Sequence, residues 1–96
     1  MHFVYCLYSP SSGRTYVGRT SNLIGRIEAH NHTSNKGFTK RYQPWEIFYF
    51  EEFSSIEESS KREKYFKSGI GREFMQDQLK SYIEQNSLGS YPPRRT

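Results

Sequence analysis

Apolar and aromatic residues at the start of the chain fall into two short segments separated by turn-forming residues. Phe3–Tyr8 is rich in aromatic and β-branched residues and predicts a strand. Ser9–Gly13 contains a proline, which fixes φ, and a glycine, which permits positive φ, so it predicts a turn. Arg14–Gly18 predicts a second strand. The two strands are expected to form an antiparallel hairpin with a long loop.

The apolar spacing then changes to that of an amphipathic helix. Leu23, Ile27 and His30 stand at positions i, i+4 and i+7, so they share one helix face. Thr20 or Ser21 is expected to cap the N terminus of this helix, because both side chains offer a hydroxyl oxygen to free backbone amides.

The middle of the chain alternates between polar and aromatic segments. The first helix is expected to fade over 32–35, and Lys36–Gln43 is predicted to be a polar, basic loop that Pro44 closes. Trp45–Phe53 is rich in aromatic residues and predicts a third strand.

Two further helices are predicted after this strand. Ser55 and Glu58 form a capping box that opens a helix ending near Lys67. Gly69 and Gly71 are expected to end this helix and to allow the next one to begin. The last helix is marked by apolar residues at helical spacing, namely Met75, Leu79, Tyr82 and Ile83.

The predicted element order is β-β-α-β-α-α, a small α/β fold in which helices pack against three short strands. Residues 1–86 are expected to form a single domain and 87–96 a flexible C-terminal tail, because that segment combines Gly, Pro and Arg. At 96 residues the chain is long enough for one domain and too short for two.

The composition indicates which kinds of binding partner and which cellular compartment are to be expected. The net charge of +4 and pI of about 9.3 favour a polyanionic partner such as nucleic acid, although ten acidic residues make the surface mixed. A mean hydropathy of −0.92, with no long apolar run and no signal-peptide pattern, predicts no membrane association. The lone Cys6 excludes an internal disulfide, so a reducing, cytoplasmic compartment is expected. The chain is also expected to be a monomer.

Four residues on the first two strands and the first helix are candidates for chemistry. Tyr5 and Tyr16 lie on adjacent predicted strands, so their hydroxyl groups meet if both face the same side. Arg26 and His30 are four residues apart on one helix face, where an arginine can clamp a phosphate and a histidine can move a proton. The competing interpretations are packing tyrosines, a solvated arginine and a histidine at the core edge.

The second predicted helix places a carboxylate where an apolar residue is expected. Glu63 shares the inward stripe with Ile56 and Phe66, and a buried carboxylate is costly unless it is paired or binds a cation. One interpretation is a ligand for Mg²⁺ or Mn²⁺, which need only one or two protein oxygens. The other is an ion pair with Lys67 or simple exposure.

Several ordered segments carry a family resemblance. Val4-Tyr5 and Tyr16-Val17-Gly18 form a two-part motif whose tyrosines are separated by ten residues. Gly18–Asn31, Pro44–Ile47 and Glu63–Phe74 follow in order. Together these segments resemble small single-domain members of the GIY-YIG nuclease superfamily over roughly residues 3–80. Phe3 stands where the family motif has its first glycine.

The resemblance implies a three-stranded antiparallel sheet flanked by helices, with a catalytic face on the sheet. Tyr5 and Tyr16 would be the paired tyrosines, one of them the general base for the attacking water, and which of the two remains open. Arg26 would hold the scissile phosphate and His30 would assist. Glu63 would bind the metal, Mg²⁺ or Mn²⁺.

The implied function is metal-dependent hydrolysis of phosphodiester bonds in nucleic acid, with DNA as the expected substrate. Arg19, beside the second tyrosine, and Lys40, in the basic loop, are the expected substrate-binding residues. The strandedness of the substrate and the choice between DNA and RNA stay open. Two alternatives are a non-catalytic module that stacks single-stranded bases, and a small protein-binding domain.

Overall fold

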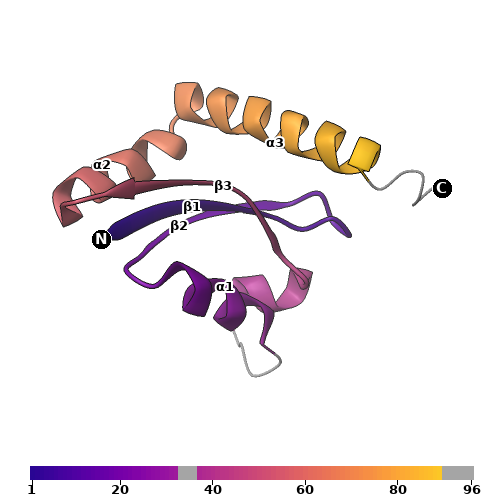
Figure 1. Cartoon of the computed structure of the whole chain (residues 1–96), viewed down its shortest axis with the longest axis horizontal. Helices are drawn as coiled ribbons and strands as arrows, with labels where there is room; N and C mark the ends of the chain where they lie inside the picture. Colours follow the sequence, from indigo (N-terminus) through magenta and orange to yellow (C-terminus); the bar gives the residue numbers. More distant parts are fainter. Residues whose placement is uncertain (33–36, 90–96) are drawn as a thin grey trace.

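A computed structural model describes residues 1–32 and 37–89, and its centre is a three-stranded antiparallel sheet (Figure 1). The strands are β1 (His2–Tyr8), β2 (Thr15–Thr20) and β3 (Glu46–Phe53), in the order β2-β1-β3. β1 is therefore the central strand, and β2 and β3 are the edges. The element order β-β-α-β-α-α and the α/β class predicted from the sequence are confirmed.

The central strand is buried on both faces because helices cover both sides of the sheet. Successive side chains of a strand point to opposite faces. Val4 and Cys6 accordingly pack with the helices on one face, and Tyr5 and Leu7 pack in the cluster on the other. All four residues are fully buried. This two-sided burial explains why β1 reads as a continuous apolar run rather than an alternating one.

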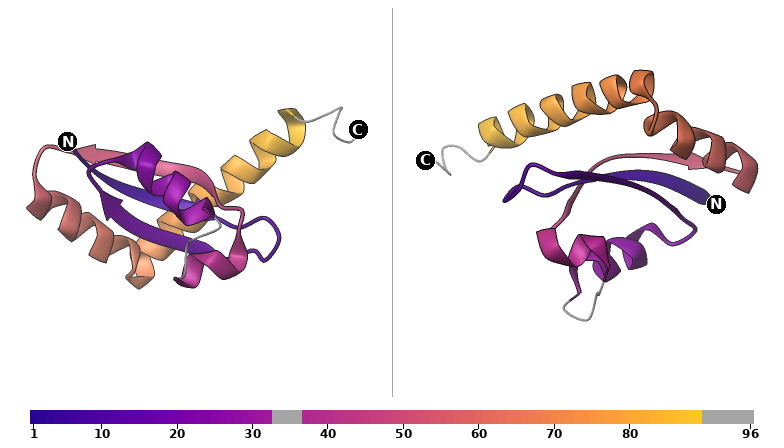
Figure 2. Two further views of the ribbon diagram at one scale, coloured as in Figure 1. Left: turned by 90° about the horizontal axis from the view of Figure 1, so that it is seen from below. Right: turned by 180° about the vertical axis from the view of Figure 1, so that it is seen from behind.

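One face of the sheet carries α1 (Leu23–Asn31) and the short 3-10 helix η1 (Phe38–Tyr42) (Figures 1 and 2). The predicted cap at Thr20 or Ser21 is wrong, since the side chain of Asn22 accepts the hydrogen bond from the Gly25 amide. The predicted loop of 36–43 is also wrong over its described part, which contains η1. Five residues in a single 3-10 turn leave no periodic pattern in a sequence.

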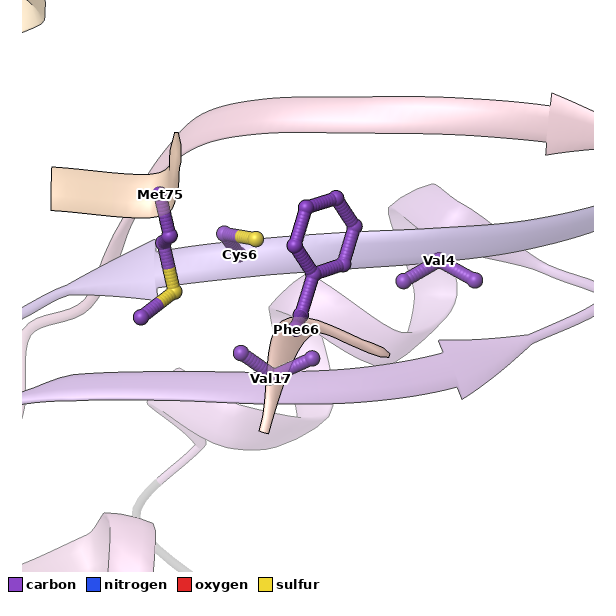
Figure 3. Close-up of a cluster of buried hydrophobic side chains, with 5 residues drawn as sticks. All are labelled: Val4, Cys6, Val17, Phe66 and Met75. Atoms are coloured by element: carbon purple, nitrogen blue, oxygen red, sulfur yellow. The ribbon is translucent and has the colours of Figure 1, made fainter. Parts of the chain in front are cut away.

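The other face carries α2 (Ile56–Phe66) and α3 (Gly69–Gly89), which meet at a corner (Figures 1 and 2). Ser55 caps α2 as predicted, accepting from the Glu58 amide at 3.1 Å. α3 extends into the segment predicted as a tail, and residues 90–96 lie outside the described part. The core on this face gathers side chains from four elements, as Figure 3 shows: Val4, Cys6, Val17, Phe66 and Met75.

The helices of the described residues are too short or too polar for membrane insertion, so none of them qualifies as a bilayer-spanning segment. Cys6 is a free thiol in the interior. Its burial raises the pKa of the thiol to about 12, which keeps it protonated and unreactive.

Candidate active site

The two motif tyrosines do face the same side of the sheet. Tyr16 pairs with Leu7 and Gly18 with Tyr5 across the β1–β2 ladder, which places all four residues on the face covered by α1. The ring centroids of Tyr5 and Tyr16 are 6.3 Å apart. Tyr5 is fully buried, whereas Tyr16, on the edge strand, is half-buried. Solvent therefore reaches Tyr16 but not Tyr5.

His30 joins the tyrosine pair from α1. Its Nε2 lies 2.8 Å from the Tyr5 hydroxyl, and its Nδ1 lies 2.9 Å from Oγ1 of Thr39 on η1. Its ring also meets that of Tyr16 edge-on, with centroids 4.8 Å apart. Burial lowers the pKa of His30, and the charge of Arg26 lowers it further. The imidazole is therefore neutral near pH 7, donating from one ring nitrogen and accepting at the other.

The loop between α1 and β3 holds this arrangement in place. The Asn31 amide pairs with the backbone of Trp45, donating to its carbonyl at 3.0 Å and accepting from its N–H at 2.6 Å. Gln43 donates to the carbonyl oxygens of His30 and His32, each at 2.8 Å. Trp45 Nε1 donates to the Thr39 carbonyl at 2.6 Å. These bonds fix η1 against the end of α1, and so fix Thr39 beside His30.

Arg26 is exposed on α1, one turn before His30. In the part of the chain that the structure describes, no carboxylate pairs with it. Its positive charge nevertheless affects the pKa values of the buried Tyr5 and His30. Burial raises the pKa of the Tyr5 hydroxyl, the neighbouring Tyr16 raises it further, and Arg26 opposes both. The structure thus places an unpaired guanidinium close to the tyrosine–histidine cluster.

Arg19 and Glu63 lie on the opposite face of the sheet. Arg19 is three residues after Tyr16, so strand alternation turns it toward α2, where its Nε donates to Glu63 Oε1 at 2.7 Å. Lys67 Nζ donates to the other oxygen, Oε2, at 3.1 Å. The ion pair of Glu63 with Lys67, one of the two interpretations from sequence, is therefore present. Arg19 contacts a carboxylate and not the tyrosine cluster.

Glu63 is ionised and close enough to the tyrosines to affect them. Its side chain is only 19% exposed. Burial alone would raise its pKa, but the hydrogen bonds from Arg19 and Lys67 outweigh burial and lower it. Among the smaller influences on Tyr5, the negative charge of Glu63 helps to raise the pKa of the hydroxyl.

Glu63 is an ionised carboxylate, and Arg19 and Lys67 bind its two oxygens, so a divalent cation would have to displace one of them. Within residues 1–32 and 37–89, His, Cys, Asp and Glu side chains form no group of three or more that could hold a metal. A single ionised carboxylate suits Mg²⁺ or Mn²⁺, which retain water molecules and take further oxygens from a phosphate. It does not suit zinc, which needs three or four protein ligands.

Some residues of the site were not found from the sequence. Lys40, expected to bind substrate, is exposed on η1 directly after Thr39. Thr39 carried no signal in the sequence, because its contact with His30 depends on how η1 packs. Gly18 and Asn31 belong to the segments that carry the family resemblance, but the contacts they make depend on the fold.

The topology and the clustered side chains define a small α/β domain in which two tyrosines and a neutral histidine meet under α1, beside an arginine that has no carboxylate partner among the described residues. Residues 1–74 match the family model of the GIY-YIG catalytic domain. The chain belongs to the GIY-YIG family, whose members are typically endonucleases that use divalent metal ions.

Curated relatives cover about two thirds of the chain. A UPF0213 protein of Clostridium perfringens is 37% identical over 67 residues, which are 70% of this chain and 71% of the relative. The UPF0213 protein YazA of Bacillus subtilis is 33% identical over 66 residues, 69% of this chain and 66% of the relative. A UPF0213 protein of Staphylococcus aureus is 34% identical over 62 residues, 65% of this chain and 74% of the relative. No solved structure matches significantly.

Proposed function

We propose that this chain is a nuclease that hydrolyses phosphodiester bonds in nucleic acid, with DNA as substrate and a divalent cation as cofactor. The observation that carries the proposal is the tyrosine–histidine cluster under α1: the Tyr5 hydroxyl lies 2.8 Å from His30 Nε2, and the rings of Tyr5 and Tyr16 are 6.3 Å apart. Arg26 is exposed one turn before His30, and Glu63, on the other face of the sheet, is near enough for its charge to help raise the pKa of the Tyr5 hydroxyl. These are the residues to which the family resemblance assigns the base, the phosphate clamp and the metal ligand.

Tyr16 is the better candidate for the general base. The attacking water must reach the base, and Tyr5 is fully buried with its hydroxyl bonded to His30. Tyr16 is half-buried on the edge strand and accessible to water. In this mechanism Tyr16 gives its hydroxyl proton to solvent and then takes a proton from the attacking water as the new P–O bond forms and the P–O bond to the leaving oxygen breaks. The leaving oxygen takes a proton from solvent, and Tyr16 returns its proton to solvent. Tyr5 and His30 position its ring.

Arg26 holds the phosphate during the attack. Its guanidinium is exposed, without a carboxylate partner in the described residues, and close to the tyrosine cluster. An arginine can donate two hydrogen bonds to the non-bridging oxygens and offset the charge that accumulates on phosphorus. Lys40, exposed on η1 of the same sheet face, is proposed to contact a neighbouring phosphate.

Glu63 would hold the divalent cation, with Arg19 and Lys67 beside it. When bound, Mg²⁺ or Mn²⁺ supplies a Lewis acid that neutralises charge on the leaving oxygen. Arg19 and Lys67 keep the Glu63 carboxylate ionised in the free protein. An arriving phosphate offers both cations a new acceptor, so the carboxylate can exchange one of its present partners for the metal.

The test is Glu63→Gln, which preserves shape and removes the charge. We expect the variant to fold normally and to lose roughly 100-fold or more of Mg²⁺-dependent cleavage of labelled DNA. Glu57→Gln, the same change at an exposed position of α2, is the matched control and should cut like the wild type. Near-full activity of Glu63→Gln would reject the metal assignment.

One observation favours a second function, a non-catalytic nucleic-acid-binding module. Both carboxylate oxygens of Glu63 are already engaged by cations. Phe3 and Phe50 form an edge-to-face pair on the α1 side of the sheet, where Phe50 is 51% exposed and could stack a base. Binding measured in EDTA, beside turnover in Mg²⁺ or Mn²⁺, separates the two functions. Tight binding without any product would support the module.

A further inference from the structure

A cleft of about 460 Å³ lies beside the candidate active site, between edge strand β2 and the corner where α2 meets α3. Its volume is within the roughly 300–1,000 Å³ typical of ligand sites. One wall comes from β2 and the other from the two helices. The lining residues that bear on its chemistry are Thr15, Tyr16, Lys67, Arg72 and Gln76.

Arg72 is the least explained residue of this cleft. It is exposed in the first turn of α3, which contains no acidic residue, and it has no carboxylate partner in the ranges the structure describes. A positive charge at a helix N terminus is opposed by the helix dipole, so this position does not stabilise the helix. Arg72 therefore adds its charge to that of the helix end. Lys67, with its side chain 54% exposed, adds a second cation to the same cleft.

The cleft adjoins the proposed reaction site through two shared residues. Tyr16 borders the cleft at the edge of the sheet, while its ring packs against His30 on the face under α1. Lys67 lines the cleft and also binds Glu63. A second hollow of about 260 Å³ lies further along β2 and contains Arg19, the other partner of Glu63. Glu63 thus contacts one cation from each hollow, and the two hollows flank it along the edge of the sheet.

We propose that the cleft binds the phosphate backbone of the nucleic-acid strand next to the bond that is cut, with Arg72 as its main contact. The inference rests on the proposed nuclease function and names where the substrate strand leaves the reaction site. Arg72 supplies a planar fork of donors that matches phosphate oxygens, Lys67 a second cation, and Gln76, one turn further along α3, a neutral donor. Because these groups are cations and hydrogen-bond donors, the cleft favours an anionic nucleic-acid strand. They do not favour a peptide that would extend the sheet by pairing with the edge strand β2.

The experiment measures binding of a labelled DNA oligonucleotide in EDTA, so that no cleavage intervenes, over about 50 to 200 mM salt. Arg72→Ala should weaken binding roughly tenfold and reduce the slope of log K against log salt by about 0.7 for single-stranded or 0.9 for duplex DNA. Lys80→Ala, which removes the same charge from an exposed position of α3 outside the cleft, is the matched control. It should leave the slope near that of the wild type.

A second pair of variants adds charge instead of removing it. Gln76→Glu places a carboxylate in the cleft and should weaken binding at least as much as Arg72→Ala, whereas Gln85→Glu makes the same change at an exposed site further along α3. In cleavage assays the cleft variants should raise KM and leave kcat within about twofold, since the cleft binds without taking part in bond breaking. All four residues are exposed, so the variants should fold.

The outcomes separate the two proposals. If Arg72→Ala and Gln76→Glu bind DNA like their controls while the wild type cuts it, the cleft proposal is overturned and the nuclease assignment stands. If the wild type neither binds nor cuts nucleic acid, the nuclease function fails and the cleft inference fails with it. Weakened binding confined to the cleft variants of a wild type that cuts DNA supports the inference. If the wild type binds DNA but never cuts it, the nuclease function is rejected, and the position of the cleft next to a cut bond is rejected with it.

Discussion

The hydroxyl end of Tyr5 occupies the space in which a side chain at position 18 would begin. A Cβ atom on Gly18 would lie 2.5 Å from the Tyr5 hydroxyl oxygen and 3.0 Å from the ring of Tyr16. The two positions are cross-strand partners, so their separation is set by the β1–β2 ladder and cannot relax easily. The glycine of the second motif triplet therefore makes room for the tyrosine of the first.

Gly18→Ala should consequently force the Tyr5 ring to move. We expect a loss of about 1–3 kcal/mol in the free energy of unfolding, the usual cost of overpacking, together with a weaker bond between Tyr5 and His30. Urea unfolding followed by circular dichroism measures the first effect. Gly69→Ala is the control, because a Cβ there meets nothing within 4 Å. Equal stability of the two variants would contradict the steric account.

The two tyrosines should respond differently to loss of their hydroxyl groups. Tyr16→Phe removes the proposed base from a half-buried site, so kcat should fall by about 10²–10⁴ with little change in stability. Tyr5→Phe leaves a buried nitrogen of His30 without its partner and should cost about 1–3 kcal/mol of stability with a smaller fall in kcat. Single-turnover rates and urea midpoints of both variants test this. Full activity of Tyr16→Phe would show that Tyr16 is not the general base.

Most of the fold was predictable because its signals are local. The aromatic and β-branched residues of the first two strands, the turn chemistry between them and the capping box at Ser55 depend on residues close in sequence, and the structure confirms these elements. The cap of α1 was misassigned for a local reason as well. Thr20 uses its hydroxyl to accept from the Asn22 amide at 3.0 Å, which leaves the cap to the Asn22 side chain.

Strand and helix periodicity could predict which candidate residues share a face, but not which contacts they make. Strand alternation alone turns Arg19 away from Tyr16, so its separation from the tyrosines could have been predicted from β2. Its bond to Glu63 could not, because that requires knowing which helix covers which face. Thr39 was equally hidden, since its hydroxyl reaches His30 only after the loop before β3 has packed against α1.

Asn31 should matter for stability and for the position of Thr39. Its side-chain amide satisfies both the N–H and the carbonyl of Trp45, which is nearly buried. Asn31→Ala leaves both backbone groups unpaired and should cost about 2–4 kcal/mol, whereas Asn31→Asp keeps the acceptor and should cost less. Thermal unfolding of both variants provides the comparison. Equal losses would show that only the bond from the Asn31 amide nitrogen to the Trp45 carbonyl contributes.

The pH dependence of stability should reveal the environment of His30. Burial, aided by the charge of Arg26, lowers its pKa in the folded protein below the ordinary value of 6.5, while the unfolded chain keeps that value. As pH falls below 6.5, the unfolded chain therefore binds the proton first, and stability is lost until the folded pKa has been passed. Above 6.5 both states are neutral at this position and the full stability is present.

Unfolding free energies at about pH 7.5 and about pH 5.5 test this, with His30→Gln as the comparison because glutamine does not titrate. The wild type should lose more stability between the two values than the variant does. Both proteins share every other titrating group, so the difference isolates His30. The carboxylates whose pKa values are lowered, such as Glu63, lose their contribution only at more acidic pH, below the ordinary value of 4.5. Identical pH profiles would mean that His30 is protonated as readily in the folded protein as in the unfolded chain, and would contradict the lowering of its pKa by burial and by Arg26.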